Sequence, residues 1–278
     1  MFILLCPCIK DSTLRAKGIT KPKDLDMFQR CLKRCEMFGI KTEFLPCPET
    51  IYFGRDRSPG CFLDKLDTAE FSGLLEKLSS DAEETVRQKG KPLCIIGVDS
   101  SPTCGVNTTY YSDKKERGRG VFLKKFSAIP ALDVSEFSEY KIYFAAPLFS
   151  DAERDFNKKM SELLRGHLFE VFLPQETGDN ESSREASSNK RIFEENLSAL
   201  KKCDIVVCVI DGADADSGAS WEMGYAYALG KKIIALRTDF RRVGKNEIVN
   251  LMLEESAVVV NSQEELLLAI NSPFCKTV

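Results

Sequence analysis

The stretch 203–236, CDIVVCVIDGADADSGASWEMGYAYALGKKIIAL, decides the fold of the second half of this chain. Its apolar run at 205–210 predicts a strand buried on both faces, and the run at 232–236 predicts a neighbouring strand. Between them an acidic loop leads into a helix predicted over 219–229, which Gly230 ends. A strand, a helix and a second strand in this order indicate a parallel βαβ unit.

The alternation of strand and helix patterns continues along the whole chain. Strands are predicted at 2–6, 41–46, 92–98, 141–145, 168–173, 205–210, 232–236 and 257–260. Helices are predicted at 23–38, 69–89, 152–165, 190–202, 219–229, 247–254 and 262–270. Helices that alternate with strands cover both faces of a parallel sheet. The sequence therefore predicts an α/β protein of two doubly wound domains with mainly parallel sheets, the second flavodoxin-like or Rossmann-like.

The boundary between the two predicted domains is placed where the strand and helix periodicity is lost. The stretch 127–139 has no clear period, so we expect a domain over 1–126, a linker over 127–139 and a domain over 140–278. The segment 175–189 is rich in Glu, Ser, Asn and Gly, and is predicted to be a mobile surface loop beside the site.

Composition limits the classes of partner. A net charge of −3 does not favour binding of a nucleic acid polymer. The sequence contains no run of eighteen apolar residues, so no membrane span is predicted. The opening MFILLCPCIK is short and lacks a basic region before it, so it is interpreted as a buried strand and not as a signal peptide. Eleven cysteines without an export signal favour a reducing, cytoplasmic location.

Four carboxylates follow the predicted strand 205–210, at the sheet end where ligands of open parallel sheets bind. They are Asp211, Asp214, Asp216 and Glu222. Such a cluster is costly unless donors or a ligand neutralise it. A purely structural explanation is equally open: the two loop aspartates could cap the helix, and Glu222 could favour its positive end.

The motifs KIYFAAPLFSDAE, DIVVCVIDGADADSGASWEMGYAYALGKKIIALRTDFR and NLM resemble the nucleoside 2-deoxyribosyltransferase family across nearly the whole second half. The most specific pieces are Asp216–Gly218, Glu222–Ala226 and Gly230–Lys231. The resemblance implies a double displacement in which Glu222 attacks C1′ of a 2-deoxynucleoside and expels the base. A carboxylate suits a transition state that resembles an oxocarbenium ion.

The resemblance also assigns roles to other residues. Tyr143 would orient Glu222, although a core aromatic on a strand remains an alternative. Asp216 would hydrogen-bond the substrate, and Asp211 and Gly218 would belong to the same substrate-binding region. Asn250 would reach the sugar in a neighbouring subunit's site, which implies a homo-oligomer, although a surface amide on a helix remains an alternative. No cofactor is expected in this domain.

Asn196 departs from the family pattern, which has an aspartate before the leucine of ENLSALKKCD. The family aspartate is associated with the proton of the base, and an amide cannot donate an acidic proton. Base activation could then fall to Glu195, Asp216 or water, which leaves hydrolysis open beside transfer. A different class is also open: a nucleotide-binding or sensing protein with a degenerate transferase fold.

In the first half, Cys8, Cys47 and Cys104 each follow a predicted parallel strand, so they are expected at one end of the sheet. They could be small buried core residues. Neighbouring prolines and the turn-like SPTCG indicate that these cysteines lie in loops. Loop thiols gathered in a reducing compartment are more often metal ligands than core residues. Cys31 and Cys35 lie four apart on a helix and are expected to pack in the core.

The pieces CPCI, CPET, SPTCG and GRGVFL resemble, in their order, the DUF523/thiouracil desulfurase family over about residues 1–126. The resemblance implies a [4Fe-4S] cluster held by Cys8, Cys47 and Cys104, with one iron open to a substrate sulfur. Ser101 and Glu49 would contact a thiolated base, although turn or capping roles would also explain them. Zinc is the competing metal, and Cys61 is an alternative ligand. The whole chain is thus predicted to process a small-molecule nucleoside, nucleotide or nucleobase.

Overall fold

The computed structural model describes residues 2–177 and 186–272. It divides into two compact units, Met1–Ser138 and Glu139–Val278. Residues 178–185 of the predicted loop 175–189 lie outside the described residues, and helix α7 (Ala186–Lys202) begins directly after them. Across the described ranges, no helix is both long and apolar enough to cross a membrane.

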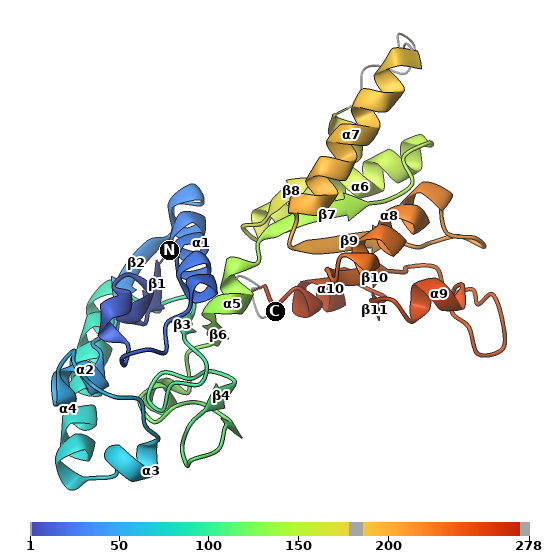
Figure 1. The fold of residues 1–278 in the computed structure, drawn as a ribbon. Coiled ribbons are helices and arrows are strands. Elements are labelled where there is room, and N and C mark those ends of the chain that lie inside the picture. The colour runs from blue at the N-terminus through green and yellow to red at the C-terminus, as the bar shows by residue number, and fades with distance from the viewer. Residues whose placement is uncertain (1, 178–185, 273–278) are drawn as a thin grey trace. The chain divides into compact units, whose positions relative to one another are not determined.

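The first unit contains a parallel four-stranded sheet in the order β2-β1-β3-β6. Its strands are β1 (Phe2–Leu5), β2 (Lys41–Phe44), β3 (Ile95–Gly97) and β6 (Ala131–Asp133), and its longest helices are α1 (Pro22–Met37) and α4 (Ala69–Lys89). Helix α1 connects β1 to β2, and α4 lies in the connection that returns from β2 past β1 to β3. Because these crossovers run in opposite directions along the sheet, right-handed connections place α1 and α4 on opposite faces, as Figure 1 shows.

Short elements complete this unit around the sheet ends. They are the 3₁₀ turns η1 (Pro7–Ile9), η2 (Ser12–Leu14) and η3 (Leu123–Phe126), the helices α2 (Pro48–Phe53), α3 (Phe62–Lys65) and α5 (Val134–Ser138), and the hairpin strands β4 (Thr108–Thr109) and β5 (Glu116–Arg117). Most of them follow strand ends, where they build the loops that surround the cysteines.

Residues 131–138 of the stretch interpreted as a linker form strand β6 and helix α5, which belong to the first unit. Strand β6 pairs in parallel with β3, with Ala131 opposite Ile95. Helix α5 packs on α1. There the buried Arg34 donates from Nη1 to the carbonyl of Phe137 at 2.9 Å, and its guanidinium lies 4.6 Å from the Phe137 ring centroid. The residues of β6, ALD, end in a carboxylate and belong to no longer apolar run, so the sequence pattern predicted no strand there.

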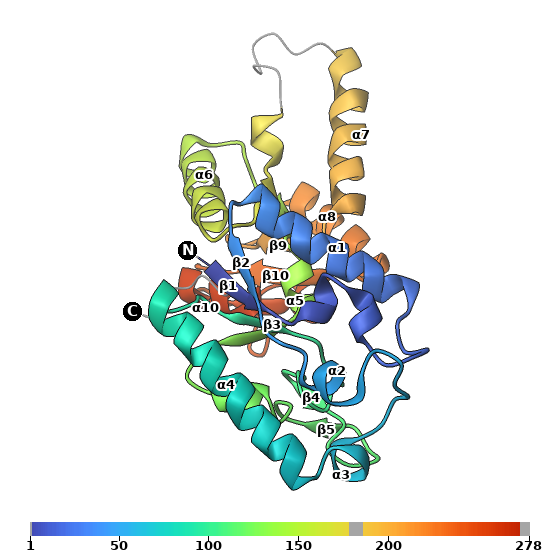
Figure 2. The same ribbon diagram turned by 90° about the vertical axis from the view of Figure 1, so that its left-hand side faces the viewer.

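The second unit is a parallel five-stranded sheet in the order β11-β10-β9-β7-β8. Its strands are β7 (Lys141–Ala145), β8 (Glu170–Phe172), β9 (Ile205–Val209), β10 (Lys232–Leu236) and β11 (Val258–Val260). Besides α7 its helical elements are α6 (Asp151–Gly166), η4 (Pro174–Glu176), α8 (Ser217–Ala228), α9 (Leu251–Glu254) and α10 (Gln263–Ala269). Within this unit, Figure 2 shows α6 and α10 on one side of the sheet and α7 and α8 on the other. The predicted two-domain, doubly wound α/β fold class is confirmed.

The Arg34 contact predicts how strongly α5 is held to the first unit. Arg34→Met should lower the free energy of unfolding by about 1–3 kcal/mol, because it leaves the buried carbonyl of Phe137 without this donor. Lys33→Ala, an exposed change on the same helix, serves as control and should stay near wild type. Urea unfolding followed by circular dichroism would measure both, and equal midpoints would refute the contribution of the contact.

Candidate functional site

Strand β7 and helix α8 bring Tyr143 and Glu222 together in the second unit. Tyr143 lies in the middle of β7, is fully buried, and donates a hydrogen bond from its hydroxyl to Glu222 Oε1 at 2.5 Å. Helix α8 is fixed above the sheet by Ala219, Met223 and Ala226, which recur every three or four residues and are buried. This apolar face holds the carboxylate of Glu222 over β7.

The start of α8 is fixed by Asp216. Its Oδ2 accepts from the backbone N–H of Ala219 at 2.8 Å, and its carbonyl accepts from the hydroxyl of Ser220 at 2.7 Å. A Cβ on Gly218 would lie 3.1 Å from Asp216 Oδ2, so glycine leaves room for this cap. The capping explanation of Asp216 is therefore correct, and its role toward a substrate stays a prediction.

A cavity of about 370 Å³ opens beside Glu222. It is lined by Tyr143, Phe193, Asn196, Leu197, Leu200, Gly218, Trp221 and Glu222. The rings of Phe193 and Trp221 lie 5.9 Å apart, and Trp221 stacks on Tyr225 at 5.3 Å. Aromatic and leucine side chains thus form most of the wall, with few polar groups, which suits a flat aromatic ligand.

The charge of Glu222 is set by this environment. Burial raises its pKa to about 7, the Tyr143 hydrogen bond opposes the rise, and the charge of Asp216 adds to it. Burial also raises the pKa of Tyr143, so its hydroxyl keeps its proton and remains a donor at neutral pH. A carboxylate that is buried, held by a donor and exposed to a cavity is the arrangement of a nucleophile or general base.

Comparisons with known proteins place this site in a family. The family model described as nucleoside 2-deoxyribosyltransferase matches residues 142–263. An uncharacterised protein of Ureaplasma parvum is 32% identical over 129 residues, which cover 41% of this chain and 80% of the relative. Through its second unit, the chain belongs to the nucleoside 2-deoxyribosyltransferase family.

Two solved structures are also similar to this unit. A conserved protein from Enterococcus faecalis is 32% identical, with a TM-score of 0.42, and the match covers 48% of this chain and 97% of that protein. A 2-deoxyribosyltransferase from Bacillus psychrosaccharolyticus is 28% identical, with a TM-score of 0.40, over 45% of this chain and 89% of that protein. Both matches cover less than half of this chain.

Besides Asp214 and Asp216, three other residues considered in the sequence analysis lie outside the residues that line this cavity. Asp211 accepts from the backbone N–H of Thr238 at 2.6 Å and thereby holds the loop after β10. Asn250 caps α9, with its Oδ1 3.0 Å from the N–H of Met252. Glu195 pairs with Arg191 at 3.0 Å. Roles for the first two at a substrate stay predictions, and base activation by Glu195 is not supported by its position.

The sequence analysis missed the aromatic wall. Phe193 and Trp221 are half exposed, at 51% and 50% of their surface, although large apolar side chains are usually buried. One available signal was that the chain has a single tryptophan, and that it directly precedes the proposed nucleophile.

The first unit carries a second cavity of about 420 Å³ at the carboxyl ends of its strands. Cys8 lies in η1, Cys47 precedes α2, and Cys104 follows β3. All three line the cavity, as do Glu49 and Ser101. The topology therefore brings together the thiols and polar groups that the sequence analysis singled out, whereas Cys61 is not among the lining residues. The prediction that Cys31 and Cys35 are buried in the core is confirmed.

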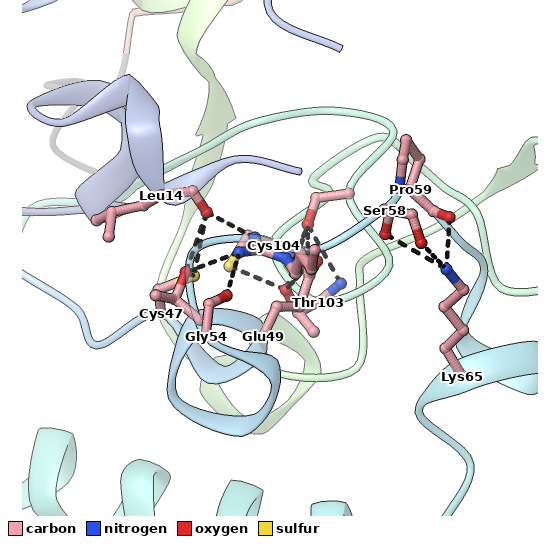
Figure 3. A network of polar contacts seen from close by, with 12 residues as sticks. Leu14, Cys47, Glu49, Gly54, Ser58, Pro59, Lys65, Thr103 and Cys104 are labelled. Atoms are coloured by element: carbon pink, nitrogen blue, oxygen red, sulfur yellow. Dashed lines mark hydrogen bonds and ion pairs between the residues drawn. The ribbon is translucent and has the colours of Figure 1, made fainter. Parts of the chain in front are cut away.

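Glu49 is held at the cavity by three donors from two loops (Figure 3). Thr103 donates from its hydroxyl to Oε1 at 2.7 Å, Ser101 donates to the same oxygen at 3.2 Å, and Arg57 Nε donates to Oε2 at 3.3 Å. The Arg57 guanidinium also donates to the carbonyl of Leu14 at 2.6 Å. The carboxylate is thus fixed in place beside the thiols.

The cavity raises the pKa values of Cys6, Cys8 and Cys47. Burial raises the pKa values of Cys8 and Cys47, and the charge of Cys104 adds to both. Cys6 also lines the cavity, and its hydrogen bond with Cys104 keeps its pKa well above the usual value. The sequence analysis missed Cys6, because it placed this residue at the end of a buried strand.

The fit of this cavity to a metal group depends on the kind of group. In the part of the chain that the structure describes, no three His, Cys, Asp or Glu side chains are grouped to hold one metal ion. Thiolates around a four-iron cluster each bind a different iron, so they stand farther apart than the ligands of one zinc ion. Three thiols around one cavity fit a cluster in donor chemistry, and the cluster stays a proposal.

The Glu222 site predicts a titration that the single tryptophan can report. Trp221 fluorescence should change with a midpoint near pH 7, where Glu222 gains its charge as the pH rises. Tyr143→Phe should move the midpoint to higher pH, because the hydrogen bond that lowers this pKa is lost. Glu222→Gln should abolish the transition. A midpoint that stays near the ordinary value of 4.5 would contradict the burial of the carboxyl group.

Proposed function

We propose that the second unit breaks the N-glycosidic bond of a 2-deoxynucleoside, or of its 5′-phosphate, through a covalent ester on Glu222. The observation that carries this proposal is the 2.5 Å hydrogen bond from Tyr143 to Glu222 at an aromatic-walled cavity. Membership of the nucleoside 2-deoxyribosyltransferase family supports the reaction class.

In the proposed first step, an oxygen of ionised Glu222 forms a bond to C1′ of the sugar. The C1′–N bond breaks, and the base leaves with the bonding electrons and takes a proton. Tyr143 donates to Oε1, which leaves the other carboxylate oxygen to attack. In the second step an acceptor base or water attacks C1′, gives up its proton, and releases Glu222 as a carboxylate.

The proposal assigns the proton of the leaving base to Asp216 or water, since Asn196 carries an amide. With no acidic group at position 196, hydrolysis accompanies or replaces transfer to a free base. Asp211 and Gly218 shape the substrate-binding region.

Asn250 is proposed to contact the sugar in the site of a neighbouring copy, so that the working form is a homo-oligomer. Its position supports this role, because helix α9 exposes Leu251 and Met252 at 51% and 76%. Apolar side chains exposed next to one another are typical of a surface that another chain covers.

The nucleophile is tested by Glu222→Ala. This change should lower base release from 2-deoxynucleosides by about 10⁴-fold or more, because the covalent route is lost. Glu194→Ala, an exposed change on α7, is the control and should keep full activity. The measurement is chromatography of bases released from a panel of deoxynucleosides and their 5′-monophosphates, with and without acceptor bases.

Two outcomes would contradict the proposal. Retention of more than about a tenth of the wild-type rate by Glu222→Ala would exclude Glu222 as nucleophile. Tight binding of a nucleotide by the wild-type protein without any release of base would instead favour the nucleotide-sensing alternative.

We propose that the first unit is an iron–sulfur module that removes sulfur from a thiolated base. The cavity lined by Cys8, Cys47 and Cys104 carries this proposal. A [4Fe-4S] cluster on three thiolates would supply an iron that binds the sulfur of the substrate as a Lewis acid. Glu49 and Ser101 would hydrogen-bond the ring of the base, with Glu49 held by Thr103 and Arg57.

The cluster is tested on protein purified without air. Roughly four irons and four sulfides per chain are expected, with broad visible absorption. Cys8→Ser, Cys47→Ser and Cys104→Ser should each remove most of the absorption, whereas Cys61→Ser should retain it. Stoichiometric zinc in a colourless protein would overturn the proposal, and loss of colour in Cys61→Ser would change the ligand set.

A further inference from the structure

The loops that follow strands β9 and β10 are joined by a buried arginine. Arg237 directly follows β10, and only 1% of its surface is exposed. Its guanidinium donates to the carbonyls of Ile210 at 2.5 Å and Gly212 at 3.2 Å, both in the loop after β9. It also donates to the carbonyl of Arg241 at 2.9 Å in its own loop. One planar group thus spans both loops, which the fork of an arginine allows and the single ammonium of a lysine does not reproduce.

Two aspartates join the same loops in the opposite sense. Asp211, in the first loop, accepts from the backbone N–H groups of Thr238 at 2.6 Å and Asp239 at 2.9 Å. Asp239, in the second loop, accepts from the N–H of Gly212 at 3.2 Å. The start of the loop after β9 is therefore fixed to the loop after β10 by donors and acceptors from both sides.

Stability alone does not explain the buried guanidinium. Its three acceptors are backbone carbonyls, and among the described residues its Nε is a buried atom without a hydrogen bond. A buried donor without an acceptor lowers stability, and so does a charge taken out of water. A group with this cost is a candidate for fixing one conformation of the chain.

The loop that Arg237 fixes leads directly to the proposed nucleophile. Gly212 turns the chain with a φ of +102°, and Asp216 then caps helix α8. The loop is thus fixed at Gly212 and again at Asp216, with residues 213–215 between these points. Asp216 lies near enough to Glu222 for its charge to raise the pKa of that carboxyl group.

We propose that Arg237 is a positioning residue for the glycosidic chemistry, because it fixes the loop after β9 and thereby the place of Asp216 beside Glu222. Since Arg237 is buried, it acts through the loop and not by contact with a ligand. Tyr143 and Cys208 also interact electrostatically with Glu222, but they lie in strands β7 and β9 and not in this loop. The inference rests on the proposed function in one respect, namely that Glu222 is the group that reacts.

The first experiment separates the geometry of Arg237 from its charge. The pH midpoint of Trp221 fluorescence reports the ionisation of Glu222 in the free protein. Arg237→Lys keeps the positive charge but does not hold both loops, so Asp216 is held less firmly and the midpoint should move to lower pH. Arg237→Met should move it in the same direction, whereas loss of a cation that acts directly would raise it. Arg242→Met, an exposed change in the same loop, is the control and should match wild type.

The second experiment shows whether Arg237 acts through Asp216. Asp216→Asn keeps an oxygen for the helix cap but removes the charge, so by itself it should lower the midpoint. Adding Arg237→Lys to Asp216→Asn should then give little further change, because the effects of coupled residues do not add.

A neutral change in the same loop provides a second variant if the Arg237 variants do not fold. Gly212→Ala strains the loop without any change of charge, because a residue with a Cβ rarely adopts a φ of +102°. It should also move the midpoint to lower pH.

Release of base from 2′-deoxynucleosides measures the consequence for the proposed chemistry. Arg237→Lys should lower kcat by about tenfold or more, because misplacement of a reacting group by about 1 Å costs up to about a hundredfold. Arg242→Met should keep the wild-type kcat.

The outcomes separate the inference from the proposed function. Midpoint shifts as expected, in a wild-type protein that releases no base from any deoxynucleoside, would sink the proposed function and keep the inference. Release of base with equal kcat and equal midpoint in wild type and Arg237→Lys would overturn the inference and keep the function. A midpoint that rises in Arg237→Met, or shifts that add fully in the double variant, would also overturn the inference.

Discussion

The hydrogen bond between Tyr143 and Glu222 is the contact on which the candidate site depends. A carboxylate buried over a sheet loses hydration, which favours its neutral form and raises its pKa to about 7. The Tyr143 hydroxyl, itself buried in β7, returns part of that stabilisation to the charged form. Helix α8 must therefore pack on the sheet in the one position that brings Glu222 to the Tyr143 hydroxyl. The apolar face of α8 fixes that position.

Both units solve the same problem at the carboxyl ends of their strands. Each must hold the carboxylate in one orientation at a cavity and prevent it from turning toward solvent. In the second unit one tyrosine holds Glu222, whereas in the first unit Thr103 and Arg57 hold Glu49 from separate loops. Donors fixed by secondary structure or by several loops give each carboxylate a defined direction, which chemistry at one atom requires.

The sequence predicted the features that follow from period and topology. Buried parallel strands produce long apolar runs, so the order of strands and helices could be predicted, and parallel strand ends explain why Cys8, Cys47 and Cys104 meet. Strand β6 could not be predicted, because its residues Ala131–Asp133 do not belong to a longer apolar run such as those around β3 and β11. The cap of Asp216 and the unpaired oxygen of Asn196 depend on side-chain geometry that no pattern of residue types records.

Asparagine at position 196 also affects the electrostatics of Glu222, the proposed nucleophile. The negative charge of Asp216 already raises the pKa of Glu222. A carboxylate at position 196, which lines the cavity beside Glu222, would raise it further. A neutral amide avoids that repulsion, so Glu222 ionises at lower pH than it would beside an aspartate. The amide also lacks the acidic proton that an aspartate could transfer to a leaving base in the proposed reaction. An amide at this position thus favours the ionised form of Glu222, the proposed nucleophile, at the expense of proton transfer to the leaving base in the proposed reaction.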